Sequence, residues 1–278
     1  MNSIMMWSGG KDSFLSMCKA IDAGYTISYL ISIIKKEDNR STYHLLSEEL
    51  IKLQAECLDI PYVKLEVSGF LLTHWQHTIS TIFCKKSRLG QSILRYMQGI
   101  KKKIGRINKM PYAVFISNLY GGYNKQLKKK LYDIITDNIQ YVIGGDVYLW
   151  KWGQKQFFDR LCKELGVTYI TPICNLPEKQ IIFDVLNLGI ESIIISVNTS
   201  LIDKEWLGRK CNSEFFRLLE EKNICLSGER GEYHTFVVDG PFFKKRINID
   251  NTKVITKGEY KFLDILSYSL GESCYRKA

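Results

Sequence analysis

Residues 8–13 read Ser8-Gly9-Gly10-Lys11-Asp12-Ser13, and they stand between a short apolar run and a segment with helical spacing. Residues 3–7 predict a buried strand, and residues 11–23 predict a helix. Glycines in a strand-to-helix turn let the backbone approach an anion closely, and the helix N-terminus adds partial positive charge. The stretch therefore predicts a pyrophosphate site, to which Lys11 adds a full charge and Ser8 and Ser13 add hydroxyl donors.

The spacing of this loop excludes two common phosphate-binding motifs. It is not GxxxxGK[ST], so a Walker-type P-loop is not indicated, and it is not GxGxxG, so a dinucleotide-binding fold is not indicated. A simpler interpretation is a glycine turn capped by Asp12 and Ser13. The position of the loop between a predicted strand and a predicted helix favours the phosphate site.

The rest of the chain repeats this alternation of strand and helix. The expected strands cover residues 3–7, 25–34, 62–67, 140–143, 168–170, 192–197, 234–238 and 246–255. The expected helices cover residues 11–23, 47–58, 127–135, 156–165 and 178–188. This order predicts an α/β fold with a Rossmann-like parallel sheet. We expect a first domain over residues 1–146 and a smaller C-terminal α+β domain over residues 147–278.

Composition and charge narrow the class of protein. The chain has 278 residues, 45% of them hydrophobic and 24% charged, which excludes disordered and collagen-like chains. We find no apolar stretch that could span a bilayer and no signal peptide, so we expect a cytoplasmic protein without a membrane partner. The eight cysteines show neither CxxC pairs nor zinc-finger spacing, and we expect most of them to be buried thiols.

The net charge of +10 is concentrated in one segment. Between Val67 and Tyr132 the chain has thirteen basic residues and no acidic one, whereas the remainder has 26 basic and 29 acidic residues, a balance of −3. The core of this segment, about residues 74–125, is expected to be an insertion into the α/β domain. One interpretation is solvated helix faces, and the other is a surface for an anionic acceptor such as RNA, an acidic protein or a carrier-bound group.

The loop at residues 8–13 resembles the SGGxDS loop of the N-type ATP pyrophosphatases, which are adenylating enzymes with a HUP-like α/β fold. The resemblance implies that the loop binds the β and γ phosphates of ATP, while a substrate oxygen attacks the α-phosphate. Residues 228–243 read GERGEYHTFVVDGPFF and resemble the GExGEYxT…DGPxF signature of the diphthine ammonia ligase family. The segments Leu53-Gln54-Ala55-Glu56 and Gly145-Asp146-Val147-Tyr148-Leu149 agree with the same family. The resemblance covers about residues 3–67 and 127–250.

The resemblance and the side-chain chemistry together give the expected site. ATP is expected to contact Ser8, Gly9, Gly10, Lys11, Asp12, Ser13, His44, Gly145 and Asp146. The expected catalytic residues are Lys11, Glu229, Glu232 and His234. Tyr233, Thr235 and Cys174 are expected to bind substrate, and Asp12 to ligate Mg²⁺. Three alternatives stay open: Glu232 as a cap of a β-turn, Tyr233 as a core residue, and His44 as a structural histidine.

Three functions fit these features. The first is an ATP-dependent ligase that adenylates a carboxyl or carbonyl group and joins it to ammonia or an amine. The second is a sulfur-transfer enzyme with the same adenylation step and a reactive Cys174 or Cys225. The third is a non-catalytic module that binds nucleotide or RNA through the basic insertion.

The acceptor substrate stays open at this level. Residues 150–154, Trp150-Lys151-Trp152-Gly153-Gln154, depart from the family pattern, which has an acidic residue and an arginine there, and the basic insertion has no counterpart in it. The expected partners are ATP, an ammonia, nitrogen or sulfur donor, and an anionic acceptor. A homodimer is one assembly that the sequence leaves open.

Overall fold

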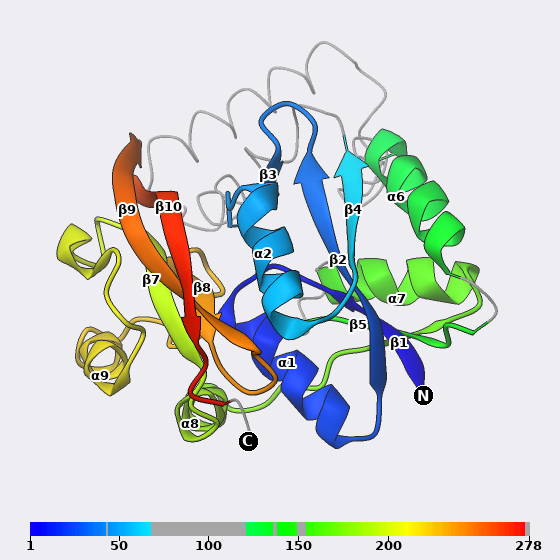
Figure 1. Ribbon diagram of the computed structural model, residues 1–278, viewed down its shortest axis with the longest axis horizontal. Helices are drawn as coiled ribbons and strands as arrows, with labels where there is room; N and C mark the ends of the chain where they lie inside the picture. Colours follow the sequence, from blue (N-terminus) through cyan, green and yellow to red (C-terminus); the bar gives the residue numbers. More distant parts are fainter. Residues whose placement is uncertain (43, 68–120, 136–137, 149–153, 276–278) are drawn as a thin grey trace, which may run out of the picture.

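The computed structural model describes residues 1–42, 44–67, 121–135, 138–148 and 154–275 (Figure 1). Residues 74–120 of the predicted basic insertion, and with them most of its basic side chains, lie outside the described residues. Within the described part, no helix is long and apolar enough to cross a bilayer. Cys18, Cys57, Cys162 and Cys211 are buried free thiols, as expected, whereas Cys174 and Cys225 are half-buried and Cys274 is exposed.

Sheet A forms the first half of the molecule. Its strands are β1 (Asn2–Met6), β2 (Thr26–Lys35), β3 (Arg40–Ser41), β4 (Tyr62–Val67), β5 (Tyr141–Ile143) and β6 (Thr168–Ile170). The order is β3-β2-β1-β5-β6, with β4 also paired to β2, and every pair is parallel except β2 with the short β3. The α/β class and the parallel sheet that the sequence predicts are confirmed.

Two pairs of helices cover the two faces of sheet A (Figure 1). Helices α1 (Lys11–Asp22) and α2 (Glu48–Leu58) lie on one face, and α6 (Gly121–Ile134) and α7 (Gln154–Glu164) lie on the other. Alternate side chains of a strand point to opposite faces. Accordingly, Met5 of β1 joins the α1–α2 core, while Ile4 and Met6 join the α6–α7 core.

Sheet B packs on the other side of α1 and α2. Its antiparallel strands, in the order β8-β7-β10-β9, are β7 (Glu191–Asn198), β8 (Tyr233–Asp239), β9 (Lys245–Lys257) and β10 (Tyr260–Glu272). Ile195 and Val238 of this sheet share one core with Phe14 of α1. The opposite face packs on α9 (Ser213–Glu221) and on the 3₁₀ turn Lys204–Trp206. Helix α8 (Glu178–Asn187) contributes to both cores, so α1 and α2 are enclosed between two sheets.

All the strands and helices predicted above are present, with end shifts of a few residues at most except at the start of α6. Sequence reasoning missed β3, β10, α9 and the 3₁₀ turn. The predicted domain boundary after Asp146 falls between β5 and β6 of one sheet, and the chain leaves sheet A only after Ile170. The strand at β7 continues the strand–helix alternation in sequence, but it belongs to the antiparallel sheet.

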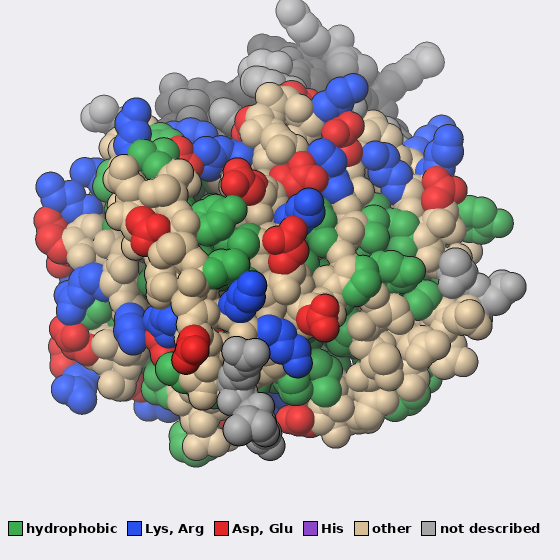
Figure 2. Space-filling model, viewed as in Figure 1, with side chains coloured by type: hydrophobic (Ala, Val, Ile, Leu, Met, Phe, Trp, Pro, Cys, Tyr) green, Lys and Arg blue, Asp and Glu red, His purple; other side chains and the backbone are tan. Residues whose placement is uncertain are grey.

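On the face shown in Figure 2, the described Lys and Arg side chains are interspersed with Asp and Glu and form no single basic patch. Four of the thirteen basic residues of the acid-free segment, Lys125, Lys128, Lys129 and Lys130, lie on α6, and Lys128 forms a 2.5 Å ion pair with Glu164 of α7. Three of these four side chains are exposed, and Lys130 is half-buried.

Candidate active site

The loop at residues 8–13 lies at the point where the chain changes sides of sheet A. After β1 the chain enters α1, on the side of sheet B, and after β5 it leads to α7, on the opposite side. Ligands of open α/β sheets bind in the crevice at such a switch point. Gly144, Gly145 and Asp146 follow β5 and meet the loop there, and a Cβ atom added to Gly145 would lie 2.8 Å from Ser13 Cα. The predicted Gly145–Asp146 segment and the predicted phosphate loop therefore form one site.

Internal hydrogen bonds fix the turn of the loop. Gly9 has a φ of +80°, which a residue with a side chain rarely adopts. Ser8 Oγ donates to Ser13 Oγ at 3.0 Å, and Ser13 Oγ donates to the Gly10 carbonyl at 2.9 Å. The Gly10 N–H lies 3.4 Å from Ser8 Oγ. The two serines thus shape the loop, and their role as phosphate donors stays a prediction.

Sheet B and the segment before it hold the loop from the other side. The Val237 N–H donates to the Gly9 carbonyl at 3.0 Å, and the Lys11 N–H donates to Thr235 Oγ1 at 3.1 Å. Lys11 Nζ donates to the Ser227 carbonyl at 2.8 Å. Thr235, which was expected to bind substrate, is buried, and its hydroxyl accepts the hydrogen bond from the loop backbone. The C-terminal signature and the loop at residues 8–13 are therefore in direct contact.

Lys11 and Asp12 form an ion pair beneath the loop. Lys11 is 1% exposed, and its Nζ lies 2.8 Å from Asp12 Oδ2. Burial lowers the pKa of Lys11, but the negative groups around it, Asp12 first, raise the pKa above its usual value. The ammonium group is thus charged and engaged by Asp12 and Ser227, and contact of Lys11 with substrate stays a prediction.

Asp12 has one unused oxygen. Its Oδ1 atom is buried and has no hydrogen-bond partner among the residues that the structure describes. A buried carboxylate oxygen without a partner calls for an explanation, and a bound cation is one. Carboxylate oxygens are ligands that Mg²⁺ prefers. The donor chemistry at Asp12 therefore fits the Mg²⁺ site that the sequence predicts.

Further carboxylates face this ion pair. Desolvation raises the pKa of Glu229 to about 8, and the charges of Asp12, Asp146 and Glu232 add to the rise, while Lys11 lowers it. The Glu229 side chain is exposed, so water weakens the desolvation, and the like charges carry the direction of the shift. Asp146 accepts a 2.7 Å hydrogen bond from the Tyr169 hydroxyl. Glu229 and Asp146 thus place two further carboxyl groups beside the Lys11–Asp12 pair, and their like charges raise the pKa of Glu229.

Glu232 and Tyr233 are structural residues in this arrangement. Glu232 is 6% exposed, and its Oε2 accepts a 2.9 Å hydrogen bond from the Arg230 N–H, so it caps the turn as the alternative interpretation held. Tyr233 is 2% exposed, packs edge-on against Phe215, and donates its hydroxyl to the Leu226 carbonyl at 2.5 Å. The direct roles predicted for these two side chains find no open surface here.

His44 and His234 bring the two halves of the chain together. Their rings stack with centroids 4.6 Å apart, and His44 Nδ1 lies 3.3 Å from the Thr235 carbonyl. A Cβ atom on Gly10 would lie 2.5 Å from His44 Cε1, so the imidazole packs against the loop. Burial lowers the pKa of His44 to about 4, and nearby Lys11 adds to that effect against the Thr235 carbonyl. His44 is therefore neutral at physiological pH.

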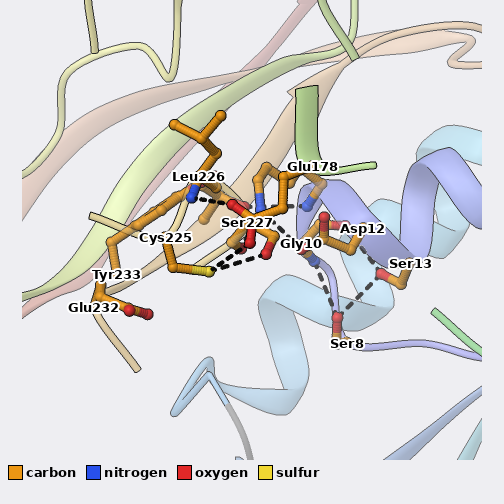
Figure 3. A network of polar contacts seen from close by, with 12 residues as sticks. Ser8, Gly10, Asp12, Ser13, Glu178, Cys225, Leu226, Ser227, Glu232 and Tyr233 are labelled. Carbon is orange, nitrogen blue, oxygen red and sulfur yellow. Dashed lines mark hydrogen bonds and ion pairs between the residues drawn. The ribbon is translucent and has the colours of Figure 1, made fainter. Parts of the chain in front are cut away.

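Glu178, which sequence reasoning missed, joins three segments next to the site (Figure 3). Its carboxylate accepts hydrogen bonds from the Tyr148 hydroxyl, from Cys225 Sγ at 3.4 Å and from the Leu226 N–H at 2.7 Å. Burial raises the pKa of Glu178, but these hydrogen bonds outweigh it and lower the pKa below its usual value. The only sequence signal is an acidic residue in the first turn of a helix, which many helices share.

Cys174 lies in the turn that follows β6. Its N–H donates to the Thr171 carbonyl at 3.1 Å, and the next residue, Asn175, has a φ of +63°. Cys225 is linked to the site, because its Sγ is 3.2 Å from the Ser227 hydroxyl and the Ser227 carbonyl accepts from Lys11.

A second group of acidic residues lies at the far end of β8. Ligand atoms of Glu191, Asp239 and Cys274 lie within 4.8 Å of one another. Asp239 is fully buried and accepts hydrogen bonds from the Gly240 and Cys274 N–H groups and from the Ser273 hydroxyl, and its carboxylate pairs with Arg246 at 3.5 Å. Glu191 pairs with Arg246 and with Lys210, each at 2.9 Å. Both oxygens of Asp239 have partners in the segment after β8, in Arg246 of β9 and in residues 273–274, so this group ties the end of β10 to β8.

Both halves of the chain match models of one protein family. Residues 1–86 match the diphthamide synthase N-terminal domain, and residues 177–270 match the diphthamide synthase C-terminal domain. The two matches come in the expected order and together span more than half of the chain. The chain belongs to the diphthamide synthase family. The matched segments contain the loop at residues 8–13 and the signature at residues 228–243, so the resemblance found in the sequence is confirmed.

Several curated relatives are named diphthine–ammonia ligase. The protein of Schizosaccharomyces pombe is 21% identical over 97% of this chain, which spans 38% of that longer relative. The protein of Bos taurus is 22% identical, over 93% of this chain and 86% of the relative, and that of Danio rerio is 23% identical, over 95% and 92%. These names are those of a ligase, the enzyme class that the sequence predicts.

Solved structures also match. One of them is described as a predicted subunit of tRNA methyltransferase from Methanocaldococcus jannaschii, it is 16% identical, and the match covers 86% of this chain and 96% of that chain. The TM-score is 0.40, and this likeness is too loose to carry an inference.

Proposed function

We propose that this protein is an ATP-dependent ligase that adenylates a carboxyl or carbonyl oxygen of an acceptor and then forms an amide with ammonia or an amine. The observation that carries the proposal is the composite loop at residues 8–13, placed at the switch point of sheet A and held by the family signature of the C-terminal half. The relatives named diphthine–ammonia ligase support the amide-forming class.

The first step would use the loop as an electrostatic cradle. An acceptor oxygen forms a bond to the α-phosphorus of ATP, the bond between that phosphorus and the α,β-bridging oxygen breaks, and pyrophosphate leaves. Negative charge then grows on the pyrophosphate, next to the N-terminus of α1. Backbone N–H groups and the helix dipole fixed at that position stabilise such charge without reorganisation.

Asp12 would hold Mg²⁺ at this step, through the Oδ1 atom that has no described partner. Bound Mg²⁺ would supply neutralisation of charge on the phosphate oxygens. The buried Lys11 fixes Asp12 by its ion pair to Oδ2, which leaves Oδ1 as the atom directed to the cation.

The second step would use the carboxyl groups beside the ion pair. Ammonia attacks the activated carbon, AMP leaves with the acceptor oxygen on its phosphate, and one proton is lost from nitrogen. Glu229 would accept that proton, because it is open to solvent and its raised pKa makes its deprotonated form a stronger base than an ordinary carboxylate. His44 and His234 line the boundary between the two halves as neutral or polar contacts for the acceptor.

Sulfur transfer is the second candidate, and the position of Cys225 two residues from Ser227 favours it. The described contacts of the thiol are the Glu178 carboxylate and the Ser227 hydroxyl. A Cys225→Ser variant, which keeps a hydroxyl donor for Glu178, should retain product formation within about twofold under the ligase proposal. Loss of sulfur-containing product in this variant would favour the sulfur-transfer enzyme instead.

The deciding experiment measures the products made from ATP. Purified protein would be incubated with ATP, Mg²⁺, ammonium and fractions of a cell lysate, and the fraction that stimulates exchange of pyrophosphate into ATP would contain the acceptor. We expect one AMP and one pyrophosphate per amide formed. Lys11→Ala serves as the inactive variant and Lys129→Ala, an exposed lysine of α6, as its matched control. Release of ADP and phosphate alone would contradict the proposal, and RNA binding without AMP formation would favour the non-catalytic module.

A further inference from the structure

Gln54 is a buried polar residue on the apolar face of α2. It has no solvent-exposed surface, and its neighbours on that face are Leu50, Leu53 and Cys57. A buried side-chain amide without hydrogen bonds would cost a few kcal/mol. The amide of Gln54 must therefore have hydrogen-bond partners inside the core.

The hydrogen bonds of the amide lead to the loop at residues 8–13, to β8 and to Trp7, which comes directly before the loop. Gln54 Nε2 donates to the Gly9 carbonyl at 3.0 Å and to the Val237 carbonyl at 2.7 Å. Trp7 Nε1 donates to Gln54 Oε1 at 3.0 Å. An indole N–H can only donate, so it fixes Oε1 towards Trp7 and Nε2 towards the two carbonyls.

The hydrogen bond to Gly9 sets the direction of the next peptide N–H. In a planar trans peptide, the C=O of one residue and the N–H of the next point in opposite directions. The Gly9 carbonyl is held towards α2 and β8, because it accepts from both Gln54 Nε2 and the Val237 N–H. The Gly10 N–H then points to the opposite side, where it donates a long hydrogen bond of 3.4 Å to Ser8 Oγ.

The packing of Gln54 against the loop also accounts for the glycine at position 9. A Cβ atom there would lie 2.7 Å from Gln54 Oε1 and 3.1 Å from Leu46 Cδ1, and the φ of +80° disfavours any side chain. Gln54 and Gly9 are thus matched in shape as well as in hydrogen bonding.

We infer that Gln54 is a positioning residue for ATP, which orients the Gly9–Gly10 peptide so that the Gly10 N–H faces the phosphates. The inference rests on the proposed function, and it adds a residue in the core of α2 to the nucleotide site. Gln54 acts through the loop and does not itself touch the ligand.

The test is a Gln54→Glu variant, with ATP affinity as the readout. The new carboxylate has the shape of the amide but no donor for the two carbonyls, so we expect the ATP Kd at pH 7.5 to rise about tenfold or more. Burial raises the pKa of such a carboxyl, and the protonated form can donate one hydrogen bond again. Lowering the pH to 5.5 should therefore recover part of the affinity. The groups that contact Gln54 are an indole and two peptides, which do not titrate, and nearby His44 and Lys11 keep their charge states in this range.

Gln140→Glu is the matched control, because it makes the same charge change at an exposed position at the start of β5. It should keep the wild-type Kd at both pH values. If Gln54→Glu binds ATP as tightly as the wild type at pH 7.5, or if its affinity does not recover at pH 5.5, the positioning role is wrong and the ligase proposal still stands. If the wild type itself does not bind ATP, both proposals fail.

A second variant serves if Gln54→Glu does not fold. Trp7→Phe removes the N–H that orients the amide and keeps an aromatic ring in the core. We expect a rise of about threefold in the ATP Kd, since the amide can then rotate. An unchanged Kd in folded Trp7→Phe would contradict the inference.

Discussion

Asp12 and Asp239 each lie beside a basic side chain, but they differ in how many of their carboxylate oxygens have a described partner. Each belongs to a sequence signature, and each forms an ion pair with a basic side chain, Lys11 or Arg246. Both oxygens of Asp239 accept hydrogen bonds from protein groups, whereas Asp12 keeps Oδ1 without a described partner. An aspartate of a sequence signature is a candidate catalytic or metal-binding residue when one of its oxygens has no partner in the described protein. It is a candidate structural residue when both oxygens have one.

Asp12→Asn should give the largest effect on activity. The change removes the negative oxygen that we assign to Mg²⁺, so the rate of acceptor-dependent AMP release should fall on the order of a thousandfold, about 4 kcal/mol. The measurement is AMP formation with the acceptor fraction, together with a Mg²⁺ titration of ATP affinity. If the variant keeps the wild-type Mg²⁺ dependence, Asp12 does not bind Mg²⁺ and does not differ from Asp239 in this respect.

Asp239→Asn should affect stability instead. It removes the charge that Arg246 faces in a fully buried position, and the free energy of unfolding should fall by about 3 kcal/mol in a urea titration. The folded variant should bind ATP with the wild-type Kd, because its contacts lie between β8 and the end of β10. Weaker ATP binding by the fully folded variant would show that Asp239 and its partners also affect the ATP site.

Gly145→Ala should weaken ATP binding about tenfold. The added Cβ would lie 2.8 Å from Ser13 Cα, which is backbone and cannot move aside, so Asp146 would be pushed away from the loop. Gly271→Ala is the control, since its Cβ would lie equally close to Asn248 Nδ2, the flexible end of a side chain remote from the site. Equal ATP affinities in the two variants would contradict the close approach of the two segments.

His44 should give the smallest effect, seen in the pH dependence of stability. Its pKa is about 4 in the folded protein and about 6.5 in an unfolded chain, so the unfolded state takes up the proton first as the pH falls. The folded state is thus favoured fully above pH 6.5 and loses this contribution towards pH 4, by about 1 kcal/mol near pH 6. His44→Gln should unfold in urea with a shallower pH dependence over that range. An unchanged profile would show that His44 does not stay neutral.

The fold could be read from the sequence wherever periodicity was strong. The alternation of apolar strands and amphipathic helices located sheet A, and the glycine-rich turn located the site, because both signals are local. Helix α9 was missed although Asn212 caps it and Phe215, Phe216 and Leu219 mark its buried face. The partner of β7 could not be read, since a strand after a helix fits a parallel or an antiparallel sheet equally well.

The site was predicted in its location and less well in its roles. Motifs brought Gly145 and the C-terminal signature to the loop, but they could not tell that Tyr233 and Thr235 face inward. Gln54 had a readable signal, a polar residue between Leu50, Leu53 and Cys57 on a helix face that is otherwise apolar. Glu178 had none of its own, because its partners come from distant segments.

The bonds from Thr235 and Val237 to the loop at residues 8–13 also bear on how the protein is made. They join positions more than two hundred residues apart, and such long-range contacts form late in folding. A nascent chain that has only sheet A would lack the Val237 N–H and the Thr235 hydroxyl, which hydrogen-bond the backbone of Gly9 and Lys11. We therefore expect nascent chains to be unable to consume ATP until β8 has left the ribosome.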